Sequence, residues 1–109
     1  MENKNQFEAQ PNNLANLINY QDGAVVSRTL IDKKAGTVTL FAFDQNQGLS
    51  EHTAPFDAMV IVLEGTAEVT IAGNPVTLKA GETTIMPAGK THALTAVTRF
   101  KMLLIMIKA

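Results

Sequence analysis

The sequence predicts an all-β barrel or sandwich of about nine short strands, because runs of apolar and β-branched residues alternate with turn residues about every 8–12 positions from residue 24 onward. The clearest run alternates Ala67, Val69 and Ile71 with Glu68 and Thr70. A period of two places one face of that strand in a core and the other in water. At 109 residues the chain is long enough for one such core and too short for a second domain.

Turn residues define where the strands begin and end. A charged turn that ends in Gly36 joins the first two runs into a hairpin, and Pro55 interrupts a strand because it has no N–H to donate. Gly65 and the segment 72–75 supply further turns. We therefore expect strands over residues 24–31, 37–43, 48–54, 57–63, 67–71, 76–79, 82–87, 92–97 and 100–107.

The last of these strands is apolar on both faces, since Lys101 is the only charged residue between 100 and 107. One barrel core can cover only one face of a strand. We therefore expect the other face to pack on the N-terminal segment or on a second subunit of a homodimer.

An N-terminal arm is expected over residues 1–22, followed by the barrel over residues 23–109. The asparagines at 12 and 13 can cap a short helical turn. Three apolar residues share one face of this turn: Leu14, Leu17 and Ile18. We expect the turn to plug one end of the barrel.

Composition and charge exclude several classes of protein. Apolar residues make up 46% of the chain, charged residues 17%, and the net charge is −1, so neither disorder nor a nucleic-acid partner is expected. The absence of cysteine excludes disulfides, thiolate metal sites and cysteine nucleophiles. The longest apolar run, residues 102–107, is far shorter than the ~20 residues of a membrane-spanning helix. The polar N-terminus lacks the apolar stretch of a secretory signal, so we expect a cytoplasmic protein with no membrane partner.

A family motif stands near the C-terminus. Gly81, Pro87, Gly89 and His92 have the spacing of the second cupin motif, which is glycine, five residues, proline, one residue, glycine, two residues and histidine. The asparagine that ends this motif is replaced by Ala96. Upstream, three residues resemble parts of the first cupin motif: Gly48, His52 and Gly65. The chain therefore resembles a small single-domain, RmlC-like cupin over residues 36–107, and the resemblance implies a double-stranded β-helix, or jelly-roll barrel.

The resemblance also implies a position for a metal ion. In metal-binding cupins, two histidines and a glutamate of the first motif join the histidine of the second motif around one divalent ion, commonly iron, manganese, zinc or nickel. His52 matches the first histidine and His92 the last, whereas Ala54 and Ala58 stand where the second histidine and the glutamate would be. Two of the four ligands are thus missing, and His52 and His92 alone make a poor site for these ions.

Asp57 is the nearest candidate for a third ligand. It precedes Ala58, so strand alternation directs it to the opposite face unless Pro55 shifts the register. The candidate metal site is therefore His52, His92 and Asp57, holding a divalent ion or no metal.

A ligand pocket is expected around the two histidines. Ala54 and Ala58 are small, which leaves room inside the barrel. The candidate ligand-binding residues are His52, His92, Met59, Met86 and Phe56, although apolar residues on barrel strands are more often plain core.

Three functions remain open at this point. The leading hypothesis is a cupin that binds a small molecule through hydrogen bonds from His52 and His92, with or without a weakly held metal. The alternative is a metal-dependent oxygenase or isomerase acting on a small organic acid, phenol or sugar. The third is a structural or regulatory dimer whose barrel is filled by side chains.

Overall fold

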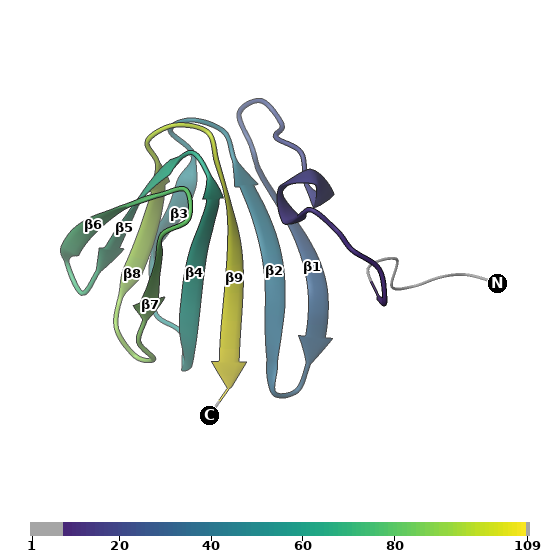
Figure 1. The fold of residues 1–109 in the computed structure, drawn as a ribbon. Helices are drawn as coiled ribbons and strands as arrows, with labels where there is room; N and C mark the ends of the chain where they lie inside the picture. The colour runs from purple at the N-terminus through teal and green to yellow at the C-terminus, as the bar shows by residue number, and fades with distance from the viewer. Residues whose placement is uncertain (1–7, 109) are drawn as a thin grey trace.

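Two antiparallel β-sheets face each other in the computed structural model, which describes residues 8–108 (Figure 1). One sheet has five strands in the order β1-β2-β9-β4-β7, and the other has four in the order β3-β8-β5-β6. The strands of the described chain are β1 (Val25–Lys33), β2 (Gly36–Phe43), β3 (Gly48–His52), β4 (Phe56–Glu64), β5 (Thr66–Ile71), β6 (Asn74–Lys79), β7 (Thr83–Met86), β8 (His92–Ala96) and β9 (Phe100–Lys108). Each predicted strand is present with its ends within two residues of the prediction, so the predicted all-β jelly-roll barrel is confirmed.

The main core lies between the two sheets. In β4 the inward residues Ala58, Val60 and Val62 are buried, and they alternate with residues that face outward. Phe43 and Phe100 stack at one end of this core with ring centroids 4.4 Å apart. Because side chains alternate along each strand, the same strands present a second apolar set on the outer face of the five-stranded sheet.

Gly65 makes the tight turn between β4 and β5. Its φ is +80°, and a Cβ at this position would lie 1.9 Å from the carbonyl oxygen of Arg99. The close approach of the Arg99 backbone therefore requires glycine here.

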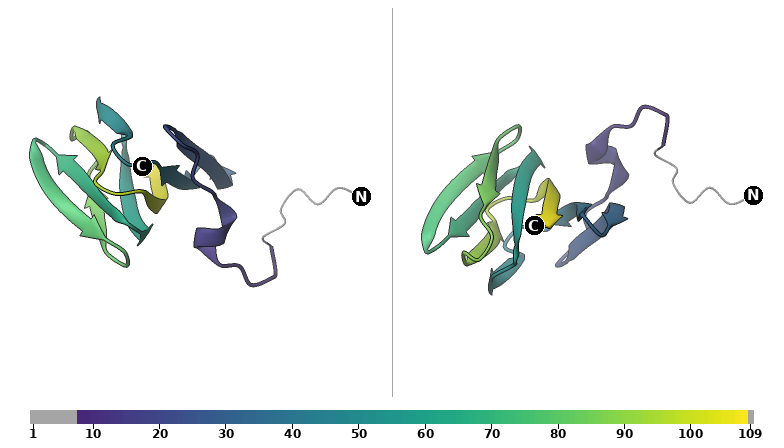
Figure 2. Two further views of the ribbon diagram at one scale, coloured as in Figure 1. Left: turned by 90° about the horizontal axis from the view of Figure 1, so that it is seen from above. Right: turned by 90° about the horizontal axis from the view of Figure 1, so that it is seen from below.

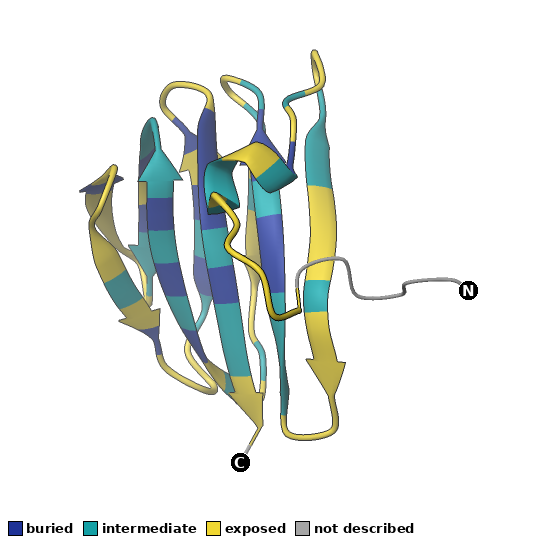
Figure 3. Ribbon diagram, turned by 45° about the vertical axis from the view of Figure 1, so that its right-hand side comes forward, coloured by how far each residue is buried: buried dark blue, intermediate teal, exposed yellow. Residues whose placement is uncertain are grey.

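The N-terminal segment covers one end of the outer face of the five-stranded sheet. Residues Leu14–Leu17 form a 3-10 helix, η1, and Asn13 caps it by accepting a hydrogen bond from the Ala15 N–H at 3.1 Å. Ile18 follows and is buried in a cluster with Leu40 and Ala42 of β2. Figures 2 and 3 show the segment on the side of this sheet away from β5 and β6.

The expectation that the helical turn plugs a barrel end is therefore wrong. The outer face of β2 and β9 offers the leucines of η1 an apolar surface, and burial of apolar area stabilises this packing. The expectation that the second face of β9 packs on the N-terminal segment is correct for Leu103.

Two side chains attach this segment to the sheet by polar contacts. The buried Lys101 of β9 donates through Nζ to the carbonyl oxygen of Ala15 at 2.6 Å. The Tyr20 hydroxyl donates to Glu64 at 2.7 Å. Burial and the Glu64 carboxylate together raise the pKa of the Tyr20 hydroxyl well above its usual value.

The boundary between arm and barrel after residue 22 stays a prediction. The arm packs on the sheet in a shared hydrophobic cluster. Residues 1–7 and 109, which include the polar N-terminus, lie outside the described part of the chain. Within the described part, no helix has the length and apolar character needed to cross a bilayer.

Candidate functional site

The two histidines of the chain are direct neighbours across two strands. His52 ends β3, His92 begins β8, and the antiparallel register pairs them. Their Nε2 atoms lie 3.1 Å apart and their rings meet edge to face, with centroids 4.3 Å apart. His92 is buried, with 5% of its surface exposed, whereas His52 is open to solvent. The pair thus spans from the barrel interior to its surface.

Backbone contacts bring the two histidine-bearing segments together. The turn over residues 87–91 leads from β7 into His92, and Gly89 donates its N–H to the carbonyl oxygen of Ala54, close after His52, at 2.9 Å. Gly89 has a φ of +79°, which few residues other than glycine adopt readily. The glycine of the second motif therefore shapes the turn that positions His92.

Hydrogen bonding determines where the imidazole protons sit. His52 Nδ1 lies 2.7 Å from the carbonyl oxygen of Ser50, which can only accept, so this nitrogen carries the proton. In the neutral ring Nε2 of His52 is then an acceptor, and Nε2 of His92 is the donor between them. In the neutral pair His92 Nδ1 keeps a lone pair; it is buried and has no hydrogen-bond partner among the described residues.

Burial is the main cause of a lowered pKa at His92. The neighbouring His52 lowers it further, because two positive rings would repel each other at this distance. The Lys90 backbone raises the pKa of His92, but more weakly than burial and His52 lower it. No described residue makes a hydrogen bond with His92 Nδ1. His92 is therefore neutral at pH 7.

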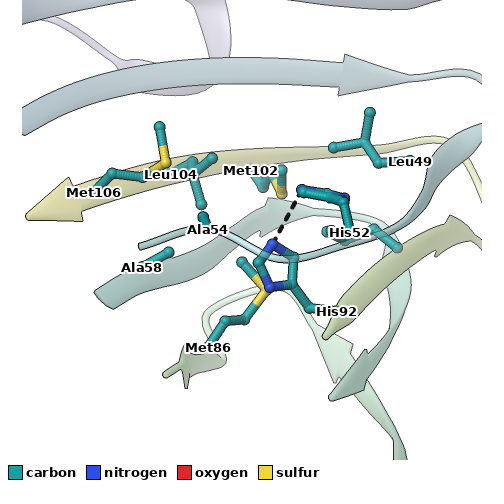
Figure 4. A pocket seen from close by; sticks show the side chains of 10 residues that line it. Leu49, His52, Ala54, Ala58, Met86, His92, Met102, Leu104 and Met106 are labelled. Atoms are coloured by element: carbon teal, nitrogen blue, oxygen red, sulfur yellow. Dashed lines mark hydrogen bonds between the residues drawn. The ribbon is translucent and has the colours of Figure 1, made fainter. Parts of the chain in front are cut away.

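A pocket of about 50 Å³ opens beside the histidine pair (Figure 4). Its other walls are apolar and come from both sheets. The lining residues are Leu49, His52, Ala54, Ala58, Met86, His92, Leu94, Met102, Leu104 and Met106. The two imidazoles are thus the polar side chains of this pocket, and three thioethers share it with them.

Family membership follows from the sequence of this barrel. A family model described as "Cupin domain" matches residues 39–108, well over half of the chain. The chain is a cupin. The resemblance inferred from the motifs around His52 and His92 is therefore confirmed.

Solved structures resemble this cupin over most of its chain. A conserved protein of unknown function from Streptococcus pyogenes is 37% identical, with a TM-score of 0.92 over 96% of this chain and 92% of that one. A cupin superfamily protein from Desulfitobacterium hafniense is 29% identical, with a TM-score of 0.91 and full coverage of both chains. A cupin 2 conserved barrel domain protein from Leptotrichia buccalis is 39% identical, with a TM-score of 0.84, over 88% of this chain and 47% of that one. Among proteins with curated descriptions, none matches this sequence.

The donors that metal-binding cupins use are incomplete in this cupin. Ala54 and Ala58 line the pocket and supply no ligand atom. Across residues 8–108, no three histidine, cysteine, aspartate or glutamate side chains come together in a way that could hold a metal ion. Two imidazoles without a carboxylate do not fit iron, manganese, zinc or nickel as the family binds them.

Asp57 is not brought to the histidines. It is exposed, it does not line the pocket, and its Oδ1 accepts a hydrogen bond from the Ala88 N–H at 2.9 Å. Strand alternation explains this placement, because Ala58 faces inward and its neighbour in β4 must face outward. Asp57 therefore holds the turn before His92 and is not positioned as a metal ligand.

Two further candidates also lie outside the pocket lining. Met59 pairs with Ile85 and Ile105 on the outer face of the five-stranded sheet, and Phe56 lies at the start of β4 beneath the Lys108 ammonium. Met86 lines the pocket as expected.

Two other methionines, Met102 and Met106, line the pocket and were not predicted from the sequence. The residues of β9 are apolar on both parities, so periodicity could not show which parity faces inward. The register of β9 with β4 would have shown it, because Met106 pairs with the inward Ala58.

Proposed function

We propose that this cupin binds a small, mainly apolar molecule in the barrel pocket, and that His52 and His92 hold its one polar group. The observation that supports this is the pair of coupled imidazoles in an otherwise apolar pocket. Such a pocket, with few convergent polar groups, is the usual form of a small-molecule site.

The volume of the pocket limits the ligand. A cavity needs about 10–15 Å³ of this kind of space for one water molecule, and an engineered cavity of about 150 Å³ binds benzene. The 50 Å³ beside the histidines therefore suits a ligand of a few non-hydrogen atoms, or one end of a larger molecule that enters past His52.

The protonation of the two histidines limits which polar group the ligand can carry. Burial lowers the pKa of His92 and so favours its neutral form. A ligand group that separates the two Nε2 atoms then meets an N–H on His92 and a lone pair on His52. A hydroxyl or carbonyl group suits this better than a carboxylate, which would need a cation. A sugar fits poorly, since the walls leave most of its hydroxyl groups without partners.

The metal-dependent oxygenase or isomerase receives less support. Both reactions need an ion with open coordination positions, and the described residues supply only two nitrogen donors of the kind the family uses. The filled-barrel alternative is also weaker, because the pocket beside His52 and His92 is not filled by side chains.

A titration with phenol and with butan-2-one, followed by NMR in a chelator-containing buffer, tests the proposal. Both probes should bind the unmodified protein, butan-2-one in the pocket and phenol with only its hydroxyl end inside the pocket. The variants H52Q and H92Q should each weaken binding about two- to tenfold, since one hydrogen bond contributes about 0.5–1.5 kcal/mol. The variant M59L, on the outer face, should bind both probes as the unmodified protein does. If neither probe changes the signals of pocket residues, the proposal is wrong.

We also propose that a second copy of the chain covers the rest of the outer face of the five-stranded sheet. A continuous row of apolar residues crosses all five strands on the outer face of this sheet: Ile31, Val38, Ile105, Met59 and Ile85. Ile31 and Ile85 are 48% and 54% exposed. Such a row can pack on its own two-fold copy, which is the symmetry of most homodimers.

A further inference from the structure

We propose that the barrel pocket catalyses keto–enol proton transfer in a small ketone or aldehyde, with Nε2 of His52 as the base at the α-carbon and the Nε2–H of His92 as the donor to the carbonyl oxygen. The reaction rests on the proposed function in one respect, because the carbonyl group must bind between the two imidazoles. It goes further by giving the two histidines different chemical roles and the pocket an activity.

His52 has the arrangement of a general base. Its Nδ1 lies 2.7 Å from the carbonyl oxygen of Ser50, so the proton sits on Nδ1 and the lone pair on Nε2. A catalytic imidazole is usually oriented by such a hydrogen bond to its second nitrogen. His52 ends β3 and is exposed, so its side chain can move outward when a carbonyl group enters between the rings.

His92 has the arrangement of the group that polarises the carbonyl. It is 5% exposed, and its cross-strand neighbours His52 and Ile71 flank it on both sides, so it stays in place while His52 moves. Its Nε2 is the donor in the neutral pair, and burial, which lowers the pKa of His92, favours this neutral ring. A neutral imidazole that polarises a carbonyl through its N–H is an established arrangement for enolisation.

The reaction moves one proton and needs no second reactant. The bond between the α-carbon and its hydrogen breaks, its electron pair forms the carbon–carbon double bond, and the π pair of the carbonyl moves to oxygen. The proton goes to Nε2 of His52. Its transfer to the oxygen gives the enol, and its return to carbon restores the ketone. Because His52 is exposed, this proton exchanges with solvent, so a deuteron replaces the α-hydrogen in deuterated water.

The walls of the pocket favour this proton transfer and limit the substrate. Among the residues that the structure describes, no carboxylate or ammonium group lines the pocket, so the two imidazoles are the groups that can move the proton. Apolar walls strengthen the attraction between the developing enolate oxygen and the N–H groups of His52 and His92. The space beside Ala54 and Ala58 admits a short alkyl group. The substrate class is therefore a carbonyl compound with short apolar substituents and at least one α-hydrogen.

The test is deuterium incorporation at the α-carbons of butan-2-one, followed by proton NMR with the whole protein in deuterated phosphate buffer that contains a chelator. We expect exchange at least about 10²-fold faster than with an equal concentration of free imidazole, since a positioned acid or base contributes about 10²–10⁴-fold. The variant H52Q should lose this acceleration. The variant H92Q keeps an N–H donor and should retain more of the rate than H92L. The outer-face variant M59L should exchange butan-2-one as the unmodified protein does.

Two results would overturn the proton transfer: exchange in the unmodified protein no faster than with free imidazole, or full exchange in H52Q. Circular dichroism and thermal unfolding establish that the variants are folded, and H52Q changes an exposed side chain that the core does not need. Binding of butan-2-one is measured separately by its NMR titration. Binding at the pocket without exchange therefore removes only the proton transfer, whereas absence of binding by butan-2-one and by phenol removes the proposed function itself.

Discussion

At the scale of single residues, the pairing of His52 with His92 dominates the chemistry of this cupin. The shared Nε2 contact leaves one proton between the rings, and burial keeps His92 neutral. A second proton on the pair would place two N–H groups against each other. Protonation must therefore break the contact or move the rings apart.

This coupling predicts a loss of stability in mild acid. The pKa of His92 is lower in the folded protein than its ordinary value of 6.5, so the unfolded chain takes up its proton first. The stabilisation is complete above pH 6.5 and is lost as the pH falls through that value toward the lower folded pKa. The free energy of unfolding, measured in urea between pH 8 and pH 5, should fall below pH 6.5.

The variant H92Q provides the control, since it has no imidazole at this position. It should show a smaller decrease in the free energy of unfolding between pH 6.5 and pH 5 than the unmodified protein. An equal decrease in both proteins would show that His92 is not the group responsible.

Asp57 contacts the turn before His92 and does not line the pocket. Its carboxylate accepts the Ala88 N–H and so fixes the 87–91 turn that leads into His92. The variant D57A should lower the free energy of unfolding by about 1–2 kcal/mol, since hydrogen bonds to charged groups contribute about 1.5–3 kcal/mol and this one is exposed. It should also weaken phenol binding, because His92 is less well held.

The matched control for D57A is D32A, which removes an exposed carboxylate at the far end of β1. Urea unfolding and the phenol titration should both leave D32A close to the unmodified protein. If D57A behaves like D32A in both measurements, the turn does not depend on the Asp57 contact.

At the scale of secondary structure, β9 connects the two apolar faces of the five-stranded sheet. Its inward residues Met102 and Leu104 belong to the barrel core, and its outward Leu103 packs under the N-terminal segment. A strand that is covered on both faces needs apolar residues at both its odd and its even positions. The arm is thus part of the hydrophobic structure of the sheet.

The variant I18A tests the contribution of the arm. Ile18 is 4% exposed and packs against Leu40 and Ala42. Its truncation should lower the free energy of unfolding by about 2–4 kcal/mol, the usual range for removing a buried aliphatic side chain. The exposed Val97 is the comparison, because V97A should change the free energy of unfolding by less than about 0.5 kcal/mol. A change in I18A as small as that in V97A would show that the arm is not packed in solution.

The sequence allowed the strands to be predicted more completely than the site. Period-two patterns and turn glycines gave all nine strands to within two residues. The meeting of His52 and His92 depended on the family motifs, because nothing in their separation of forty positions indicates a register. Met102 could not be assigned to the pocket. Both the odd and the even positions of β9 are apolar, so alternation does not show which of them face inward. The N-terminal segment was expected on the outer face of β9, which is correct for Leu103, but η1 itself was placed at a barrel end. Periodicity identifies an apolar face without identifying its partner.

At the scale of the whole molecule, the apolar row on the outer face of the five-stranded sheet predicts a homodimer. Light scattering should give the mass of a dimer, and the variant I85K should shift the mass toward that of a monomer because a charge would be buried at the interface. V97K places the same charge at a residue that is 47% exposed and lies after β8 of the other sheet, and it should remain dimeric. A monomer mass for the unmodified protein at micromolar concentration would contradict the assembly.

The most direct test of the central claim is the imidazole ¹⁵N spectrum of His52 and His92 during a phenol titration of metal-free protein. We predict that the Nε2 signals of both histidines shift together and saturate with one phenol per chain, while methyl signals of Ile85 and Ile105 on the outer face stay fixed. Unchanged histidine signals, with shifts confined to the outer face, would show that the barrel pocket is not the binding site.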